Sequence, residues 1–192
     1  MTAELLRLLD IAERLGNLAE ARLKALGAPH GLQTMHMRVL LYLAAANRYS
    51  NTPVAVGEFL GLTKGTVSQS LILLESKGFL IRSPDPCDRR IVRLALTGAG
   101  QRVVAQTEDL GRLRAAAAAL PLGLAEGLTR LLRQLQILEG RRSFGQCRTC
   151  RHHLAEGDDL WRCGLTGEPL SLSDGERICR EHQDAEAPPS PD

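Results

Sequence analysis

The sequence predicts a mainly α fold with a small β-hairpin, followed by a small Cys-rich segment near the C-terminal end. Three observations predict this. Apolar residues recur at helical spacing over most of residues 1–140, and two strand-like runs joined by a turn interrupt them once. Four of the five cysteines lie between Cys147 and Cys179. The 192 residues suffice for one large domain, or for an ordinary domain with an appendage.

The first half of the chain contains four predicted helices. The first is amphipathic and ends at Gly27, with Pro29 soon after. The second covers residues 34–46 and the third residues 54–60. The fourth begins at Thr63 and ends at residues 77–78, where a glycine suits a left-handed C-terminal cap.

The hairpin and two further helices follow. Residues 79–82 and 90–96 have the pattern of strands, and two prolines mark the turn between them. Thr97 can cap a long helix, and Pro121 starts another. Their apolar positions include Val103, Val104, Leu110, Leu113, the alanine run 115–119, Leu124, Leu128, Leu131, Leu135 and Leu138.

These elements predict three parts of the chain. Residues 1–142 form a helical body and residues 146–184 a Cys-rich module, while the tail 185–192 is expected to be disordered. Within the body, helices at about 1–30 and 98–140 flank a lobe at about 34–97. Both flanking regions carry leucine stripes that a body of this size could not hide alone. We therefore expect them to form the interface of a homodimer.

Charge and composition narrow the classes of function. Residues 1–146 contain 19 Lys and Arg against 12 Asp and Glu, a balance of +7, whereas residues 147–192 have a balance of −5 from 5 against 10. A basic body fits a polyanionic partner. Aromatic residues are only 3% of the chain, which argues against RNA-binding sheets and single-strand grooves. There is no apolar run of about 18 residues and no export signal, so we expect a cytoplasmic protein.

The lobe has the layout of a winged helix-turn-helix: a helix, a tight turn, a helix and a two-stranded hairpin. On the fourth helix, Val67, Leu71 and Leu74 share one face. The other face presents polar side chains suited to base edges and phosphates of duplex DNA, and the hairpin tip presents two arginines suited to the minor groove. These predicted DNA-binding residues are Thr63, Lys64, Thr66, Ser68, Gln69, Arg89 and Arg90. Two alternatives are that these faces are merely solvated, or that the unit is a scaffold for protein contacts.

Residues 54–100 also carry a family resemblance. The helix-turn-helix segment, the sequence Asp-Pro-Cys-Asp-Arg-Arg at residues 85–90 and Leu-Thr-Gly-Ala-Gly at residues 96–100 resemble the MarR family of dimeric transcription regulators. The resemblance extends more loosely over residues 1–140. It implies a homodimer on a pseudopalindromic operator, usually as a repressor, with a pocket for a small-molecule effector. Asp85 and Asp88 would be wing residues, and Cys87 stands where the family often has an arginine.

The Cys-rich module has the pattern of a metal site. Cys147 and Cys150 form a Cys-x-x-Cys pair, and Cys163 and Cys179 complete a set of four. His152 and His153 are spare candidates, and His182 is an alternative ligand. So short a segment with few large apolar residues usually needs a staple, which a metal supplies. Both Zn²⁺ and an iron–sulfur cluster fit four cysteines, and the sequence leaves this choice open. Two further alternatives are that the cysteines bind no metal or that they form a disulfide pair.

No enzyme class is indicated. The sequence contains no phosphate-binding glycine loop, nucleophile elbow or metalloprotease helix motif. We therefore expect a DNA-binding regulator whose cysteine centre senses redox or iron state. A regulator with a structural zinc and a protein-interaction scaffold are the alternatives.

Overall fold

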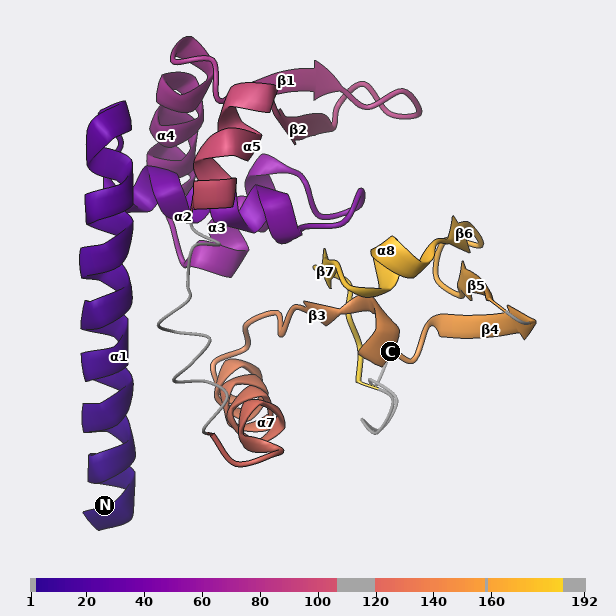
Figure 1. The fold of residues 1–192 in the computed structure, drawn as a ribbon. Helices are drawn as coiled ribbons and strands as arrows, with labels where there is room; N and C mark the ends of the chain where they lie inside the picture. Colours follow the sequence, from indigo (N-terminus) through magenta and orange to yellow (C-terminus); the bar gives the residue numbers. More distant parts are fainter. Residues whose placement is uncertain (1–2, 107–119, 158, 185–192) are drawn as a thin grey trace.

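The computed structural model describes residues 3–106, 120–157 and 159–184. Within these residues the predicted fold class is confirmed, because helices dominate and the strands form only short antiparallel sheets. One long helix runs along one side of the molecule, and the hairpin and the Cys-rich module both lie on the side away from it (Figure 1). None of the helices described is long and apolar enough to cross a membrane.

The long helix α1 (Ala3–Gly27) ends at the predicted glycine, and the short helix η1 (Ala28–His30) turns the chain toward α2 (Thr34–Ala45). A capping box begins α2, in which the Gln33 backbone N–H donates to His36 Nδ1 at 3.1 Å. Met37, Val39 and Leu40 of α2 are fully buried. The other helices of the body therefore pack around α2, its most buried helix.

Two capped helices form the helix-turn-helix. They are α3 (Pro53–Leu60) and α4 (Lys64–Ser76), and each is preceded by an N-cap threonine whose Oγ1 accepts a backbone N–H. Thr52 accepts from Ala55 at 3.3 Å and Thr63 from Thr66 at 3.2 Å. Such caps satisfy amides that a helix start leaves unpaired, so the chain can turn sharply between the two helices.

The hairpin consists of β1 (Leu80–Pro84) and β2 (Val92–Leu96), paired antiparallel from Leu80 with Leu96 to Pro84 with Val92. Thr97 then caps α5 (Gly98–Ala105). A Cβ at Gly100 would lie 2.1 Å from the Phe79 carbonyl oxygen, so only glycine lets α5 approach the hairpin this closely. This explains the last glycine of the Leu-Thr-Gly-Ala-Gly motif. The continuation predicted through Leu110, Leu113 and residues 115–119 lies outside the described residues.

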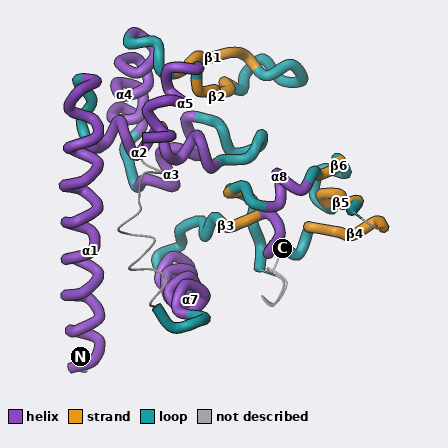
Figure 2. The backbone as a smooth tube through the Cα atoms, in the orientation of Figure 1, coloured by secondary structure: helices purple, strands orange, loops and turns teal. Residues whose placement is uncertain are grey.

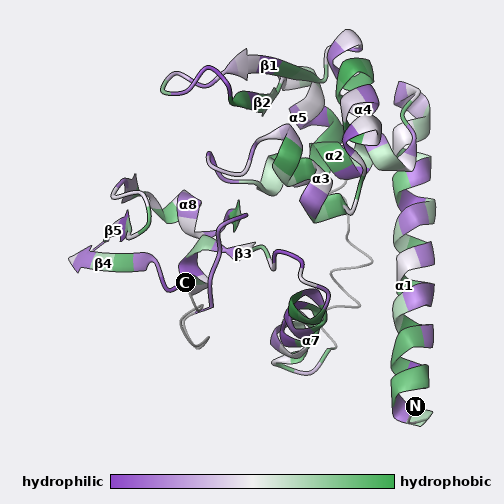
Figure 3. Cartoon of the chain, turned by 180° about the vertical axis from the view of Figure 1, so that it is seen from behind, coloured by the Kyte–Doolittle hydropathy of each residue, from purple (hydrophilic) through white to green (hydrophobic). Residues whose placement is uncertain are grey.

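The second long amphipathic helix of the body is α7 (Leu124–Leu138), and none of its residues is buried. Its leucines are exposed in the single chain, as are those of α1 between Leu5 and Leu18 except for the half-buried Leu8. The large exposed apolar residues of the two helices are Leu5, Leu6, Leu9, Ile11, Leu15, Leu18, Leu124, Leu128, Leu131, Leu132, Leu135, Ile137 and Leu138. In Figure 3, α1 and α7 both carry green, hydrophobic bands along their length.

The Cys-rich module is built from short strands and turns (Figure 2). One sheet pairs β3 (Gly145–Gln146) with β7 (Ile178–Cys179), and the other has the order β4 (His153–Gly157), β5 (Leu160–Cys163), β6 (Pro169–Leu170). The helices η3 (Cys147–Thr149) and α8 (Leu172–Gly175) connect them. The module adjoins the body, because the Asn47 N–H donates to the Ile178 carbonyl at 2.9 Å.

Candidate nucleic-acid interface and cysteine cavity

The recognition helix α4 separates its apolar and polar faces as predicted. Val67, Leu71 and Leu74 are buried in the body core. The predicted DNA-binding residues Thr63, Lys64, Thr66, Ser68 and Gln69 are exposed at the N-terminal end of the helix. Thr63 has a second role, because its Oγ1 caps the helix and lies 2.9 Å from Thr66 Oγ1. The exposed polar row therefore stands on a capped and anchored helix.

The hairpin tip presents the two predicted arginines. Both are exposed, and Arg90 forms a two-fold ion pair with Asp88, Nε to Oδ1 and Nη2 to Oδ2 both at 3.0 Å. Arg89 forms no ion pair with the residues that the structure describes. Arg89 is therefore the wing arginine with its guanidinium available to a phosphate or a minor groove.

Asp85 shapes the wing loop. Its Oδ1 accepts the backbone N–H groups of Cys87 at 2.8 Å and Asp88 at 3.0 Å, and its Oδ2 accepts Arg93 Nε at 2.6 Å. These bonds, led by that from Arg93, lower the pKa of the Asp85 carboxyl. Asp85 thus holds the backbone of the loop that carries the two arginines.

Arg93 connects the wing to the loop between α2 and α3. Its Nη1 donates to the Arg48 carbonyl at 2.8 Å and to Asn51 Oδ1 at 3.2 Å. Sequence reasoning missed this residue. Its position in an alternating strand marked it only as a polar outward side chain.

The four predicted cysteines of the module line one cavity of about 230 Å³. Cys147 begins η3 and Cys150 follows it, while Cys163 ends β5 and Cys179 ends β7. The body contributes Asn47 and Tyr49 to the same cavity, and the other lining residues are His152, Leu165, Thr166 and Glu181. The spacing in the sequence thus predicted residues that the fold brings together.

The thiols of the module are buried or half-buried, and Cys150 accepts a backbone hydrogen bond. Burial, followed by the neighbouring thiols of Cys179, Cys150 and Cys163, raises the pKa of Cys147 to about 12. Burial also raises the pKa of Cys179, against hydrogen bonds from the Asn47 side chain and the Glu181 backbone. Cys150 Sγ accepts the Gln183 N–H at 3.4 Å.

The histidines of the module differ in position. His152 lines the cavity, and His153 Nδ1 lies 3.5 Å from Cys147 Sγ. The alternative ligand His182 lies outside the lining, where its Nε2 forms a 2.9 Å hydrogen bond with Thr149 Oγ1. Among the described residues, no group of three or more His, Cys, Asp or Glu side chains is arranged to hold a metal ion. Metal binding by the four cysteines therefore stays a prediction.

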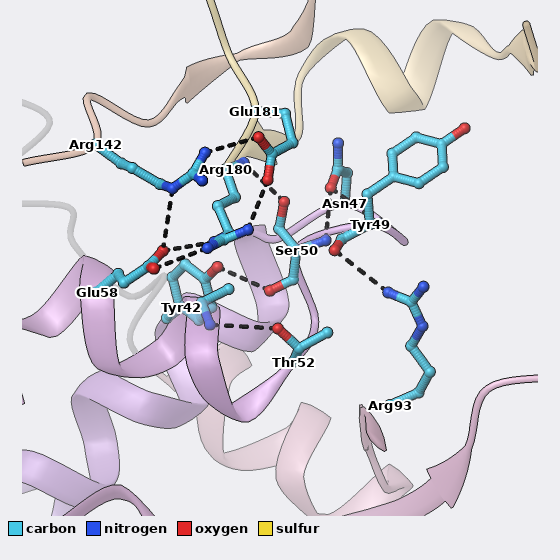
Figure 4. A network of polar contacts seen from close by, with 11 residues as sticks. Tyr42, Asn47, Tyr49, Ser50, Thr52, Glu58, Arg93, Arg142, Arg180 and Glu181 are labelled. Atoms are coloured by element: carbon cyan, nitrogen blue, oxygen red, sulfur yellow. Dashed lines mark hydrogen bonds and ion pairs between the residues drawn. The ribbon is translucent and has the colours of Figure 1, made fainter. Parts of the chain in front are cut away.

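A polar network joins the module to the helix-turn-helix (Figure 4). The backbone N–H of Arg180 donates to Ser50 Oγ at 2.8 Å. The side-chain Nη2 of Arg180 donates to Glu58 Oε1 on α3, also at 2.8 Å. The bond from Arg180 lowers the pKa of Glu58. Arg142 completes the network, with Nη1 2.7 Å from Glu181 Oε2. Sequence reasoning found none of these contacts, because long-range ion pairs leave no periodic pattern.

The comparisons with known proteins agree with this geometry. A sequence model described as the MarR family matches residues 30–91. No curated protein sequence matches the chain.

Three solved structures show the fold. CouR from Rhodococcus jostii RHA1, bound to p-coumaroyl-CoA, is similar with a TM-score of 0.54 and 22% identity, over 65% of this chain and 88% of CouR. FabT of Streptococcus pneumoniae in complex with DNA has a TM-score of 0.52 and 24% identity, over 69% and 94%. A MarR family transcriptional regulator from Rhodococcus sp. RHA1 has a TM-score of 0.52 and 20% identity, over 70% and 96%. This chain therefore has a MarR-type winged-helix fold, with residues 30–91 as the segment that matches the family.

Proposed function

We propose that this chain is a sequence-specific transcription regulator that binds duplex DNA as a homodimer. The observation that carries the proposal is the exposed polar row of α4, Lys64 to Gln69, beside a wing whose Arg89 is unpaired among the described residues. Glutamine can pair with adenine in the major groove, and lysine with guanine or a phosphate. FabT, which has the same fold, was solved in complex with DNA.

The exposed leucines of α1 and α7 support the dimer. Apolar stripes on two helices of a single chain are an interaction surface, and a two-fold symmetric pair of chains buries both at once. Such a dimer would place two α4 helices in successive major grooves, about 34–36 Å apart. An operator with two inverted half-sites follows from that symmetry, and its occupation would repress transcription.

A small-molecule effector fits the same proposal. A second cavity, of about 270 Å³, lies between α1 and the start of α2, where it is lined by Glu20, Gln33, Thr34, Met35 and Arg38. CouR was solved with a small ligand bound. A ligand in this cavity would act on the angle between the dimer helix α1 and the DNA-binding lobe.

The first test is selection of duplexes from a random-sequence library by the full chain, followed by affinity measurements on the enriched duplex. We expect an inverted repeat and an affinity that falls steeply with salt, because bound arginines and lysines release counterions from the phosphates. A protein-interaction scaffold would give no enrichment and no salt dependence. Either of those results would contradict the proposal.

The second test uses one helix as its own control. Gln69→Ala should cost about 1–3 kcal/mol of binding free energy and relax the preference at one base pair. Ser76→Ala, at the other end of α4, should leave the affinity for the enriched duplex unchanged. Equal affinities for wild type and Gln69→Ala would show that α4 does not read the bases.

A further inference from the structure

We propose that the cavity lined by the four cysteines binds an iron–sulfur cluster, and that occupancy of this site sets the position of the wing. The first part concerns the module alone. The second part rests on the proposed DNA-binding function.

The donor set and the size of the cavity fit a cluster. Iron–sulfur clusters are held by four cysteine thiolates, and all four cysteines of the module face this cavity. A single zinc ion bonds sulfur at about 2.3 Å, so its four thiolates must converge on one point. The four cysteines share a cavity of about 230 Å³, but among the described residues no group of three or more His, Cys, Asp or Glu side chains converges on one ion. An iron–sulfur cluster spreads its cysteine ligands over several iron atoms, so the shared cavity suits a cluster better than one ion.

A hydrogen bond to sulfur strengthens the case. The backbone N–H of Gln183 donates to Cys150 Sγ at 3.4 Å, and such donors are one means by which a protein tunes a cluster. Asn47, which belongs to the body, binds the residue before Cys179, because its N–H donates to the Ile178 carbonyl at 2.9 Å.

The body therefore completes the site. Asn47 and Tyr49 line the cavity from the loop between α2 and α3. Asn47 Oδ1 also accepts the N–H groups of Tyr49 at 3.1 Å and Ser50 at 3.0 Å, which holds this loop in its turn. A group bound to Cys179 would thus contact a residue that shapes the loop.

The same loop leads to the wing. Arg93 of β2 donates to the carbonyls of Arg48 and Tyr49, and the contact with Tyr49 is drawn in Figure 4. The Arg93 Nε donates to Asp85, which in turn holds the wing loop. A second connection runs from Cys179 through Arg180 to Glu58 on α3. Apart from the peptide link between Cys179 and Arg180, the contacts named are hydrogen bonds or ion pairs between described residues, so loss of the bound group would loosen contacts on which the wing depends.

The first experiment measures what the site holds. The full chain, purified without oxygen and reconstituted with ferrous iron and sulfide, should contain iron and sulfide in equal amounts and absorb visible light. Cys163→Ser should lose most of both. Cys87→Ser, on the exposed wing, is the matched control and should retain them. One zinc per chain without sulfide, or a Cys163→Ser protein with undiminished iron, would overturn the cluster.

The second experiment measures the coupling. Cluster-loaded protein should bind the enriched duplex at least about fivefold more tightly than cluster-free protein, the low end of typical coupling between sites. Arg180→Gln should keep its iron and sulfide but bring this ratio close to one. Arg148→Gln, which removes an ion pair to Glu176 inside the module, should keep the wild-type ratio.

The outcomes separate the two proposals. If neither the cluster-loaded nor the cluster-free protein binds duplex DNA, the proposed function is refuted. The measured iron and sulfide contents would still decide whether the cavity holds a cluster. Equal affinities of the two forms of the wild type would refute the coupling alone.

Discussion

Apolar side chains fill the interior of the winged-helix body, whereas the module has little interior of this kind. The body core includes fully buried residues of α2, α3, α4 and both hairpin strands. In the described part of the module, the buried residues are Cys147, Leu170, Gly175 and His182. The module instead contains a cysteine cavity, turns and ion pairs, and it rests on the body through the network around Arg180.

This difference indicates two sources of stability in one chain. Burial of apolar area is the main source of stability in the body core. A segment of the module's size usually needs a metal, a disulfide or a partner to hold its shape. The module has two such supports available: its contact with the body and the group that we propose for its cavity.

The two parts can be followed separately. Trp161 in β5 is the single tryptophan of the chain, so its fluorescence reports on the module. Far-UV circular dichroism reports mainly on the helices of the body. If the parts are distinct cooperative units, the fluorescence should change at a lower urea concentration than the helical signal.

The largest effect is expected from a cavity in the body core. Leu74→Ala removes a side chain that is 0% exposed and should lower the free energy of unfolding seen by circular dichroism by about 2–5 kcal/mol. Ile72→Ala, two residues earlier on α4 at 54% exposure, should change it by no more than about 0.5 kcal/mol. Equal losses from both variants would mean that the core is not where the body gains its stability.

A smaller effect is expected at the junction of the two parts. The Phe144 ring lies 5.2 Å from that of Phe59 and 6.2 Å from that of Tyr42, both edge-on. Phe144→Leu keeps an apolar side chain but loses these ring contacts, at a cost of about 0.5–1.5 kcal/mol. We expect this loss of unfolding free energy to appear in the transition that Trp161 fluorescence follows. A shift confined to the helical transition would instead assign Phe144 to the body alone.

Phe144 also illustrates what the sequence can and cannot predict. For the helices that the structure describes up to residue 76, the spacing of apolar residues predicted the bounds to within about two residues, because burial on one face imposes a three- and four-residue spacing. The glycines of residues 140–145 predicted a boundary after residue 142. Yet Phe144, beyond that boundary, packs into the body core, since a single anchoring side chain leaves no repeating signal.

The same limit applies to the two candidate sites. The exposed face of α4 and the four cysteines could be named from the sequence, because helical spacing and a Cys-x-x-Cys pair are local patterns. Asn47, Arg93 and Arg180 could not, because each acts on a residue far away in the chain. The candidate ligands could be read from local sequence, and the contacts that connect them to the wing could not.

The smallest effect concerns the ion pair between Arg180 and Glu58. The bond from Arg180 holds the pKa of Glu58 below its ordinary value, so the carboxylate stabilises the docked module above about pH 4.5 and this contribution is lost as the pH falls further. Both side chains are partly exposed, which limits the contribution to about 1 kcal/mol or less. At pH 7, Glu58→Gln should lower the free energy of unfolding followed by Trp161 fluorescence by that amount. The difference from wild type should shrink as the pH falls below about 4.5 and Glu58 becomes protonated. A difference that is constant with pH would show that Glu58 acts through packing and not through its charge.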